Sequence, residues 1–241
     1  AVLVTGTVHA GGIDAVIENA RAIPGYLSLT TIATPVLDAN GIQQIVDGAP
    51  VFGEPTSYGF LKIVSTMSWG LGYFGMPQVL LRFMAIRRED ELKRSRRIAM
   101  IWVVISLAVA VFIGVIGLAM TKAGAVETLK GSASETIIVK ISSLLSTYGV
   151  ISALVAGVII AGILASTMST ADSQLLAASS SVSENILNKT FKLNLSNKAS
   201  MLAARLTLVV IAIIGIVIAW NPESSVFTIV SFAWAGFGAT F

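Results

Sequence analysis

The stretch IAMIWVVISLAVAVFIGVIGLAM, residues 98–120, holds 23 residues without a charged side chain. As an α-helix it is about 34 Å long, enough to cross a hydrocarbon core of roughly 30 Å. The whole chain has the same character, because 55% of its 241 residues are hydrophobic, 12% are charged and the mean hydropathy is +0.84. A soluble domain carries about a quarter charged residues, so a water-facing shell cannot be built from this sequence. We predict an all-α, polytopic membrane helical bundle in a lipid bilayer.

Four further segments are predicted to be membrane spans: residues 58–86, 150–187, 201–220 and 226–241. The chain begins on an apolar stretch with no initiator Met and no basic n-region, so this stretch is not a signal peptide. The chain ends inside an apolar run. We therefore expect residues 1–241 to be a single transmembrane domain that is an internal fragment of a longer membrane protein.

The distribution of basic residues predicts the orientation. Eleven of the 16 Lys and Arg residues lie in residues 82–97 and 184–205, whereas the intervening loops hold four basic and eight acidic residues (10–57, 121–149, 221–225). The positive-inside rule then makes loops 87–97 and 188–200 cytoplasmic, and the five spans alternate without conflict. We predict a multi-pass protein of the plasma membrane. Because the basic residues flank membrane spans, we expect no nucleic-acid partner.

Three stretches of the long non-cytoplasmic loops have an amphipathic pattern: GIDAVIENARAI, ANGIQQIVDG and ETIIVKISSLLSTYG. We expect short helices there. They can serve as lids over an outer vestibule or as simple connectors.

Residues 68–78, SWGLGYFGMPQ, contain the pattern G-x-G-x-x-G at Gly70, Gly72 and Gly75, with acidic residues about 20 positions further on. That pattern is the fingerprint of a dinucleotide-binding βαβ unit. The fingerprint requires a preceding buried strand and a soluble α/β context, and neither is present here. The nucleotide-binding interpretation is excluded.

Two interpretations of these glycines remain. One is a flexible or closely packed membrane helix, in which Gly and Pro are common. The other is an unwound helix: Pro77 lacks an N–H group, so carbonyls near Tyr73 lose their partners, which is costly in lipid unless they line a wet cavity or a ligand. Trp69, Tyr73 and Pro77 have the spacing i, i+4 and i+8 and are expected on one face beside the break.

A stripe of hydroxyl groups is predicted in ILASTMSTADSQLL, where Ser166, Ser169, Thr170 and Ser173 have the spacing i, i+3, i+4 and i+7. Hydroxyl and carbonyl oxygens suit a small hard cation such as Na⁺, and without charge they let it leave again. The alternative is that these side chains hydrogen-bond their own helix and permit close packing. Asp172, at the cytoplasmic edge of the same span, is either an ion-attracting group or a solvated charge at the end of the helix.

Enzymatic chemistry has no candidate residues in this sequence. It contains no Ser/His/Asp set, no paired catalytic carboxylates, no P-loop and no cysteine, and the only histidine, His9, is expected to be structural. We predict that the protein is not an enzyme.

At these motifs the sequence resembles the solute:sodium symporter family, and within it the bacterial sodium/proline symporters. The resemblance implies that the plasma membrane in question is a bacterial inner membrane. The matching blocks are WGLGYFG followed by Pro77, RFMA with the basic loop, ILASTMSTADSQLL and NPESSVFTIVSFAWAGFGATF, which cover most of residues 59–241. The resemblance implies a LeuT-like core of two inverted five-helix repeats. The chain would then run from the end of core helix 5 to the start of core helix 10.

The resemblance also implies the site residues. Sodium would be held by the Ser166 carbonyl and the hydroxyls of Ser169 and Thr170, and solute by residues of core helices 6 and 10 (Trp69, Tyr73, Pro77, Trp234). Met76 and Gln78 stand where well-known proline carriers have Gln and His. The implied function is sodium-coupled import of a small solute, L-proline, by reciprocal coupling of ion and solute binding. A transporter-like sensory input domain of a signalling protein and a sodium symporter for another amino acid or a carboxylate are the alternatives.

Overall fold

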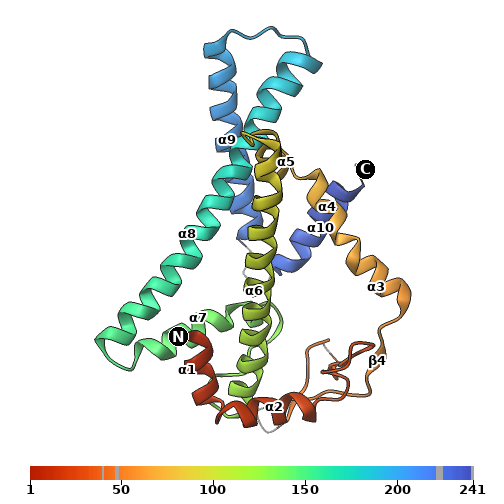
Figure 1. Cartoon of the computed structure of the whole chain (residues 1–241), viewed down its shortest axis with the longest axis vertical. Helices are drawn as coiled ribbons and strands as arrows, with labels where there is room; N and C mark the ends of the chain where they lie inside the picture. Colours follow the sequence, from red (N-terminus) through yellow and green to blue (C-terminus); the bar gives the residue numbers. More distant parts are fainter. Residues whose placement is uncertain (40, 47–48, 221–224, 240–241) are drawn as a thin grey trace. The chain divides into compact units, whose positions relative to one another are not determined.

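The computed structural model describes residues 1–39, 41–46, 49–220 and 225–239 (Figure 1). Over these residues the chain is mostly helical, and three helical segments are long and apolar enough to cross a membrane, Glu89–Lys122, Val150–Thr190 and Asn197–Ala219. The second consists of helix α8 (Val150–Ser180) and a continuing π-helix, η3 (Ser181–Thr190). The predicted class of a helical membrane protein is confirmed.

The chain divides into two compact units, Ala1–Trp69 with Arg87–Ile160, and Gly70–Ile86 with Ala161–Phe241. The first holds helices α1 (Val2–His9), α2 (Ile13–Ala22), α3 (Phe60–Met67), α6 (Glu89–Lys122), η2 (Gly131–Thr136) and α7 (Ile137–Ser146). The second holds η1 (Tyr73–Gly75), α5 (Pro77–Met84), η3, α9 (Asn197–Ala219) and α10 (Val226–Gly238). Helices α4 (Trp69–Gly72) and α8 contribute residues to both units.

The core of the first unit lies around the C-terminal half of α6, where α1, α2 and α7 pack (Figure 1). Met120 and Ile141 are fully buried at its centre. Small residues let the backbones approach: a Cβ added at Gly6 would lie 2.6 Å from the Ile116 side chain, and one at Gly117 would lie 2.5 Å from Ile137. This is the small-residue packing that membrane helices use in place of a hydrophobic driving force.

The segment between α2 and α3 forms two small antiparallel sheets. Strand β1 (Thr31–Ile32) pairs with β4 (Thr56–Ser57), and β2 (Ile45–Val46) pairs with β3 (Ala49–Pro50). The helix expected in ANGIQQIVDG is therefore wrong for the described residues 41–46; residues 40, 47 and 48 of that stretch lie outside the description. The other two expected helices are present as α2 and α7.

Local turn chemistry explains the missing helix. Gly41 has φ of +74°, which breaks a right-handed helix, and the Asp38 carboxylate accepts the Ile42 N–H at 2.9 Å. The β-branched Ile45 and Val46 that follow favour an extended backbone. The hydrophobic pattern alone did not predict these strands, because a pattern of only a few residues fits a short helix and a short strand equally well.

The acidic residues that follow the glycine pattern lie at the start of a helix. Glu89, Asp90 and Glu91 form the first turn of α6, where the positive end of the helix dipole favours carboxylates. Two of them pair with neighbouring arginines: Arg87 with Glu91 at 2.8 Å and Arg88 with Asp90 at 3.1 Å. These acidic residues therefore stabilise the start of α6, and no nucleotide is needed to explain them.

Candidate solute and sodium sites

The predicted span 58–86 is not one helix. After α3 it continues as α4, one 3₁₀ turn over Tyr73–Gly75, and an extended residue, Met76, with φ of −82° and ψ of 112°. Helix α5 then starts with Pro77 at its first position, where a proline costs no hydrogen bond. Of the two interpretations left open by the sequence, the interrupted helix is the one that the structure has.

One detail of the predicted break is wrong. The Tyr73 carbonyl does not lose its partner to the proline, because the Met76 N–H donates to it at 3.3 Å. A 3₁₀ turn provides this donor three residues on, in place of the one an α-helix would use four residues on. The face expected for Trp69, Tyr73 and Pro77 also does not exist as a continuous helical face, since the three residues lie in three different elements, α4, η1 and α5.

Two of the three glycines allow α10 to pack closely within the second unit. A Cβ added at Gly72 would lie 2.5 Å from the Trp234 ring, and one at Gly75 would lie 2.6 Å from the Phe237 carbonyl oxygen. Gly70 faces open space, with nothing within 4 Å of such a Cβ. The glycine spacing that imitates a nucleotide fingerprint therefore serves helix packing at two of its three positions.

This packing builds an aromatic cluster at the break. The rings of Tyr73 and Trp234 meet edge to face, with centroids 5.3 Å apart and an interplanar angle of 83°. Phe237, one turn along α10, adds a second edge contact to Trp234 at 6.1 Å. The sequence analysis did not include Phe237, although its i+3 spacing from Trp234 on the same helix was a readable signal.

The structure brings together only part of the predicted solute site. Tyr73, Pro77 and Trp234 belong to the second unit, and Tyr73 and Pro77 are both exposed. Trp69 belongs to the first unit, with 36% of its surface exposed. What the structure describes is an exposed phenol held against an indole beside an interrupted backbone, which offers a hydroxyl and two aromatic surfaces to a small molecule.

The predicted sodium ligands form one stripe on α8, in the second unit. Ser166, Ser169 and Thr170 are all exposed, and the Thr170 hydroxyl donates to the Ser166 carbonyl at 3.1 Å. The Ser173 hydroxyl donates to the Ser169 carbonyl at 3.0 Å in the same way. The hydroxyls thus make the bonds to their own helix that the alternative interpretation expected, which leaves their role in ion binding untested.

Asp172 lies on α8 and is exposed. His9 has the structural role that was expected. Its Nδ1–H donates to the Thr5 carbonyl at 2.7 Å, and its Nε2 pairs with the Tyr148 hydroxyl, which ties the end of α1 to the residues after α7.

The family model for sodium:solute symporters matches residues 4–241. The chain belongs to the sodium:solute symporter family. This is a family of LeuT-like membrane transporters, so the predicted fold class, the resemblance and the prediction that the protein is not an enzyme are confirmed.

Curated relatives are similar over three quarters of the chain. It is 40% identical over 181 residues to the "High-affinity proline transporter PutP" of Bacillus subtilis (strain 168), covering 75% of this chain and 37% of that protein. It is 39% identical over 185 residues to the "Sodium/proline symporter" of Staphylococcus aureus, covering 76% of this chain and 35% of that protein. The chain thus spans a little over a third of the length of these relatives. No solved structure matches it.

Proposed function

We propose that the protein is a sodium-coupled symporter that imports a small organic solute, L-proline, and that residues 1–241 belong to its single transmembrane transporter domain. The observation that carries this proposal is the edge-to-face pair of Tyr73 and Trp234 at an interrupted helix. The names of the relatives, a proline transporter and a sodium/proline symporter, support the choice of solute. In this proposal, loops 87–97 and 188–200 face the cytoplasm.

The solute site is proposed to consist of Trp69, Tyr73, Pro77 and Trp234. The pyrrolidine ring of proline is a compact apolar body that matches aromatic surfaces, and the Tyr73 hydroxyl can donate to its carboxylate. An interrupted helix adds main-chain groups that a continuous helix would keep for itself. Trp234 is proposed to close the outer side of this site.

The sodium site is proposed to use the Ser166 carbonyl and the hydroxyls of Ser169 and Thr170. The Ser166 and Thr170 oxygens lie 3.1 Å apart. With metal–oxygen distances of about 2.4 Å, oxygens at this separation subtend about 80° at a shared cation, close to an octahedral angle. The Thr170 hydroxyl has only to rotate its proton away from the carbonyl for both oxygens to face the ion. Asp172 is proposed to attract the ion as it leaves inward.

Coupling is proposed to be reciprocal. Sodium binding to α8 stabilises the state that binds solute, and solute binding equally strengthens sodium binding. For one ion per solute, 100 mV contributes about 2.3 kcal/mol and a tenfold sodium gradient about 1.4 kcal/mol. The sum supports a solute gradient of roughly a few hundredfold. Uncharged ligands suffice, because no covalent step is involved.

The proposal is tested by uptake of labelled L-proline into proteoliposomes that contain the full-length protein. Uptake should need an inward sodium gradient and should not proceed when potassium replaces sodium. A matched pair of variants tests the ion site: Thr170→Ala removes a stripe hydroxyl, whereas Thr167→Ala removes a hydroxyl that also bonds its own helix, at 2.8 Å to the Leu164 carbonyl, but lies off the stripe. Proline uptake that ignores sodium refutes the coupling, and equal sodium dependence in both variants refutes the ion site.

A further inference from the structure

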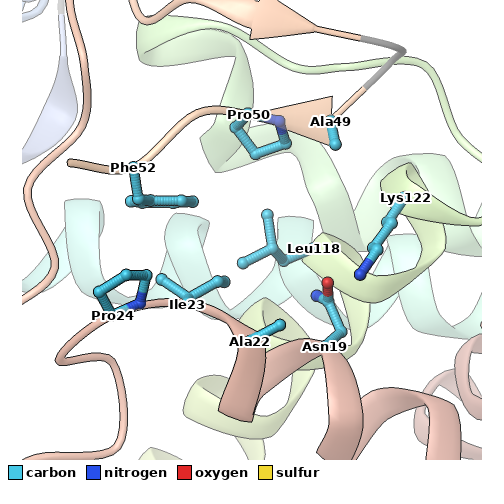
Figure 2. Close-up of a pocket in the computed structure, with 9 residues that line it drawn as sticks. All are labelled: Asn19, Ala22, Ile23, Pro24, Ala49, Pro50, Phe52, Leu118 and Lys122. Carbon is cyan, nitrogen blue, oxygen red and sulfur yellow. The ribbon is translucent and has the colours of Figure 1, made fainter.

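A pocket of about 180 Å³ lies wholly within the first unit, between the end of α2, strand β3 and the last turn of α6 (Figure 2). A volume of this size holds a few water molecules or one small solute, and is well below the pockets of drug-sized ligands. None of the residues proposed for the sodium and solute sites lines it.

Most of the pocket wall is apolar. Leu118 of α6 forms its centre, Phe52 and Pro50 lie on one side, and Ile23 and Pro24 after α2 lie on the other (Figure 2). The two proline rings and the phenyl ring are rigid surfaces, so they present a preformed slot to a flat apolar ring at little entropic cost.

Two polar groups converge at one end of this slot, the side-chain amide of Asn19 on α2 and the ammonium of Lys122 at the end of α6 (Figure 2). Asn19 is 8% exposed, and among the residues that the structure describes no hydrogen bond joins its amide to another group. The amide atoms themselves are not fully buried, so the amide is free to donate to a ligand that enters the pocket. In the described part of the chain, no carboxylate lies within ion-pair distance of Lys122.

We propose that this pocket binds a small organic carboxylate with a short apolar body. The carboxylate accepts hydrogen bonds from the Lys122 ammonium and the Asn19 amide, and the apolar body lies against Leu118 and Phe52. Charge-assisted hydrogen bonds of this type are about twice as strong as neutral ones. The end of α6 alone would explain a lysine, which is favoured near a helix C-terminus, but it would not explain the amide of Asn19 beside it.

The lining residues that the structure describes include no carboxylate, so none of them pairs with the ammonium group of an amino acid. The site should therefore take cyclopentanecarboxylate at least as well as L-proline, which has the same ring with an amine in place of one CH₂. It should not take pyrrolidine, which lacks the carboxylate. The inference does not need the proposed transport function, because binding here uses neither the sodium stripe nor the Tyr73–Trp234 cluster.

The 241 residues contain no cysteine, so a site-specific test is possible once any cysteine elsewhere in the full-length protein is replaced with serine. Ala49→Cys places a thiol on the pocket wall, and Ser57→Cys places one on exposed strand β4, outside the pocket. The rate of alkylation by a maleimide is measured on the full-length protein without sodium. We expect cyclopentanecarboxylate and L-proline, but not pyrrolidine, to slow the reaction of the cysteine at position 49 and to leave that at position 57 unchanged.

Variants of the polar end complete the test. Lys122→Gln should raise about threefold to tenfold the concentration of cyclopentanecarboxylate that halves the labelling rate at position 49. Asn19→Asp should abolish this protection, because it puts a negative charge beside the ligand's carboxylate. Lys130→Gln, which removes an exposed lysine outside the pocket, should have no effect. Unchanged labelling rates without ligand show that a variant is folded. Absent protection, equal protection by pyrrolidine, or protection only in sodium overturns the inference, whatever the outcome of the uptake assay.

Discussion

Replacing Gly75 with alanine tests whether the glycines near the break exist to admit α10. The new methyl carbon would lie 2.6 Å from the Phe237 carbonyl oxygen and 3.0 Å from the Phe237 Cβ. Main-chain atoms cannot rotate away as a side chain can, so the two segments must separate. Overpacking of this kind costs about 1–3 kcal/mol.

The same motif contains a matched control. Gly70→Ala adds the same methyl group where nothing lies within 4 Å, so the variant should be neutral or slightly more stable, because alanine is the better helix former. Gly72→Ala should fall between the two, since its methyl would meet the Trp234 ring, which has some freedom to move.

The assay is thermal unfolding of the full-length protein in detergent, with proline uptake measured in parallel. We expect the midpoint of Gly75→Ala to lie roughly 2–10 °C below that of the unaltered protein, and its uptake to fall because the Tyr73–Trp234 contact is displaced. If Gly75→Ala and Gly70→Ala unfolded at the same temperature, close packing of α10 would not be the reason for the glycine.

Three further predictions address the ion site, the aromatic cluster and the Glu127–Lys140 ion pair. Thr170→Ala should raise the half-saturating sodium concentration about tenfold or more, whereas Thr170→Ser, which keeps the hydroxyl, should stay near the unaltered value in sodium-dependent uptake. Trp234→Leu should raise the half-saturating proline concentration about threefold to tenfold by removing the contact with Tyr73, and Trp234→Phe should raise it less. The Lys140 ammonium, by hydrogen bond and charge, lowers the pKa of the Glu127 carboxyl. Because the pKa of Glu127 is lower in the folded than in the unfolded protein, the ion pair stabilises the fold at neutral pH, and this stabilisation is lost as the pH falls through the folded pKa. The unfolding midpoint of Glu127→Gln should therefore fall less on acidification than that of the unaltered protein.

Hydropathy and charge were sufficient to predict the membrane class. Residues 98–120 lie within α6 as expected, because an apolar backbone in lipid must satisfy its own hydrogen bonds and a helix does so locally. Pro77 made an interrupted helix one of the two interpretations, since the missing N–H is a property of the residue itself. In contrast, ANGIQQIVDG was misread as a helix, because the turn at Gly41 and the pairing of β2 with β3 outweigh a weak periodic pattern.

The sequence by itself therefore determined that this protein is a helical membrane protein and which hydroxyls share a stripe, because both follow from local chemistry and spacing. It left open whether the helix around Pro77 is interrupted, and the structure shows that it is. Only the tertiary structure decided that Gly72 and Gly75, but not Gly70, face α10, that Phe237 joins the Tyr73–Trp234 pair, and that Asn19 and Lys122 meet at one pocket. These residues are far apart along the chain. Their proximity depends on how separate helices pack, which no single stretch of sequence encodes.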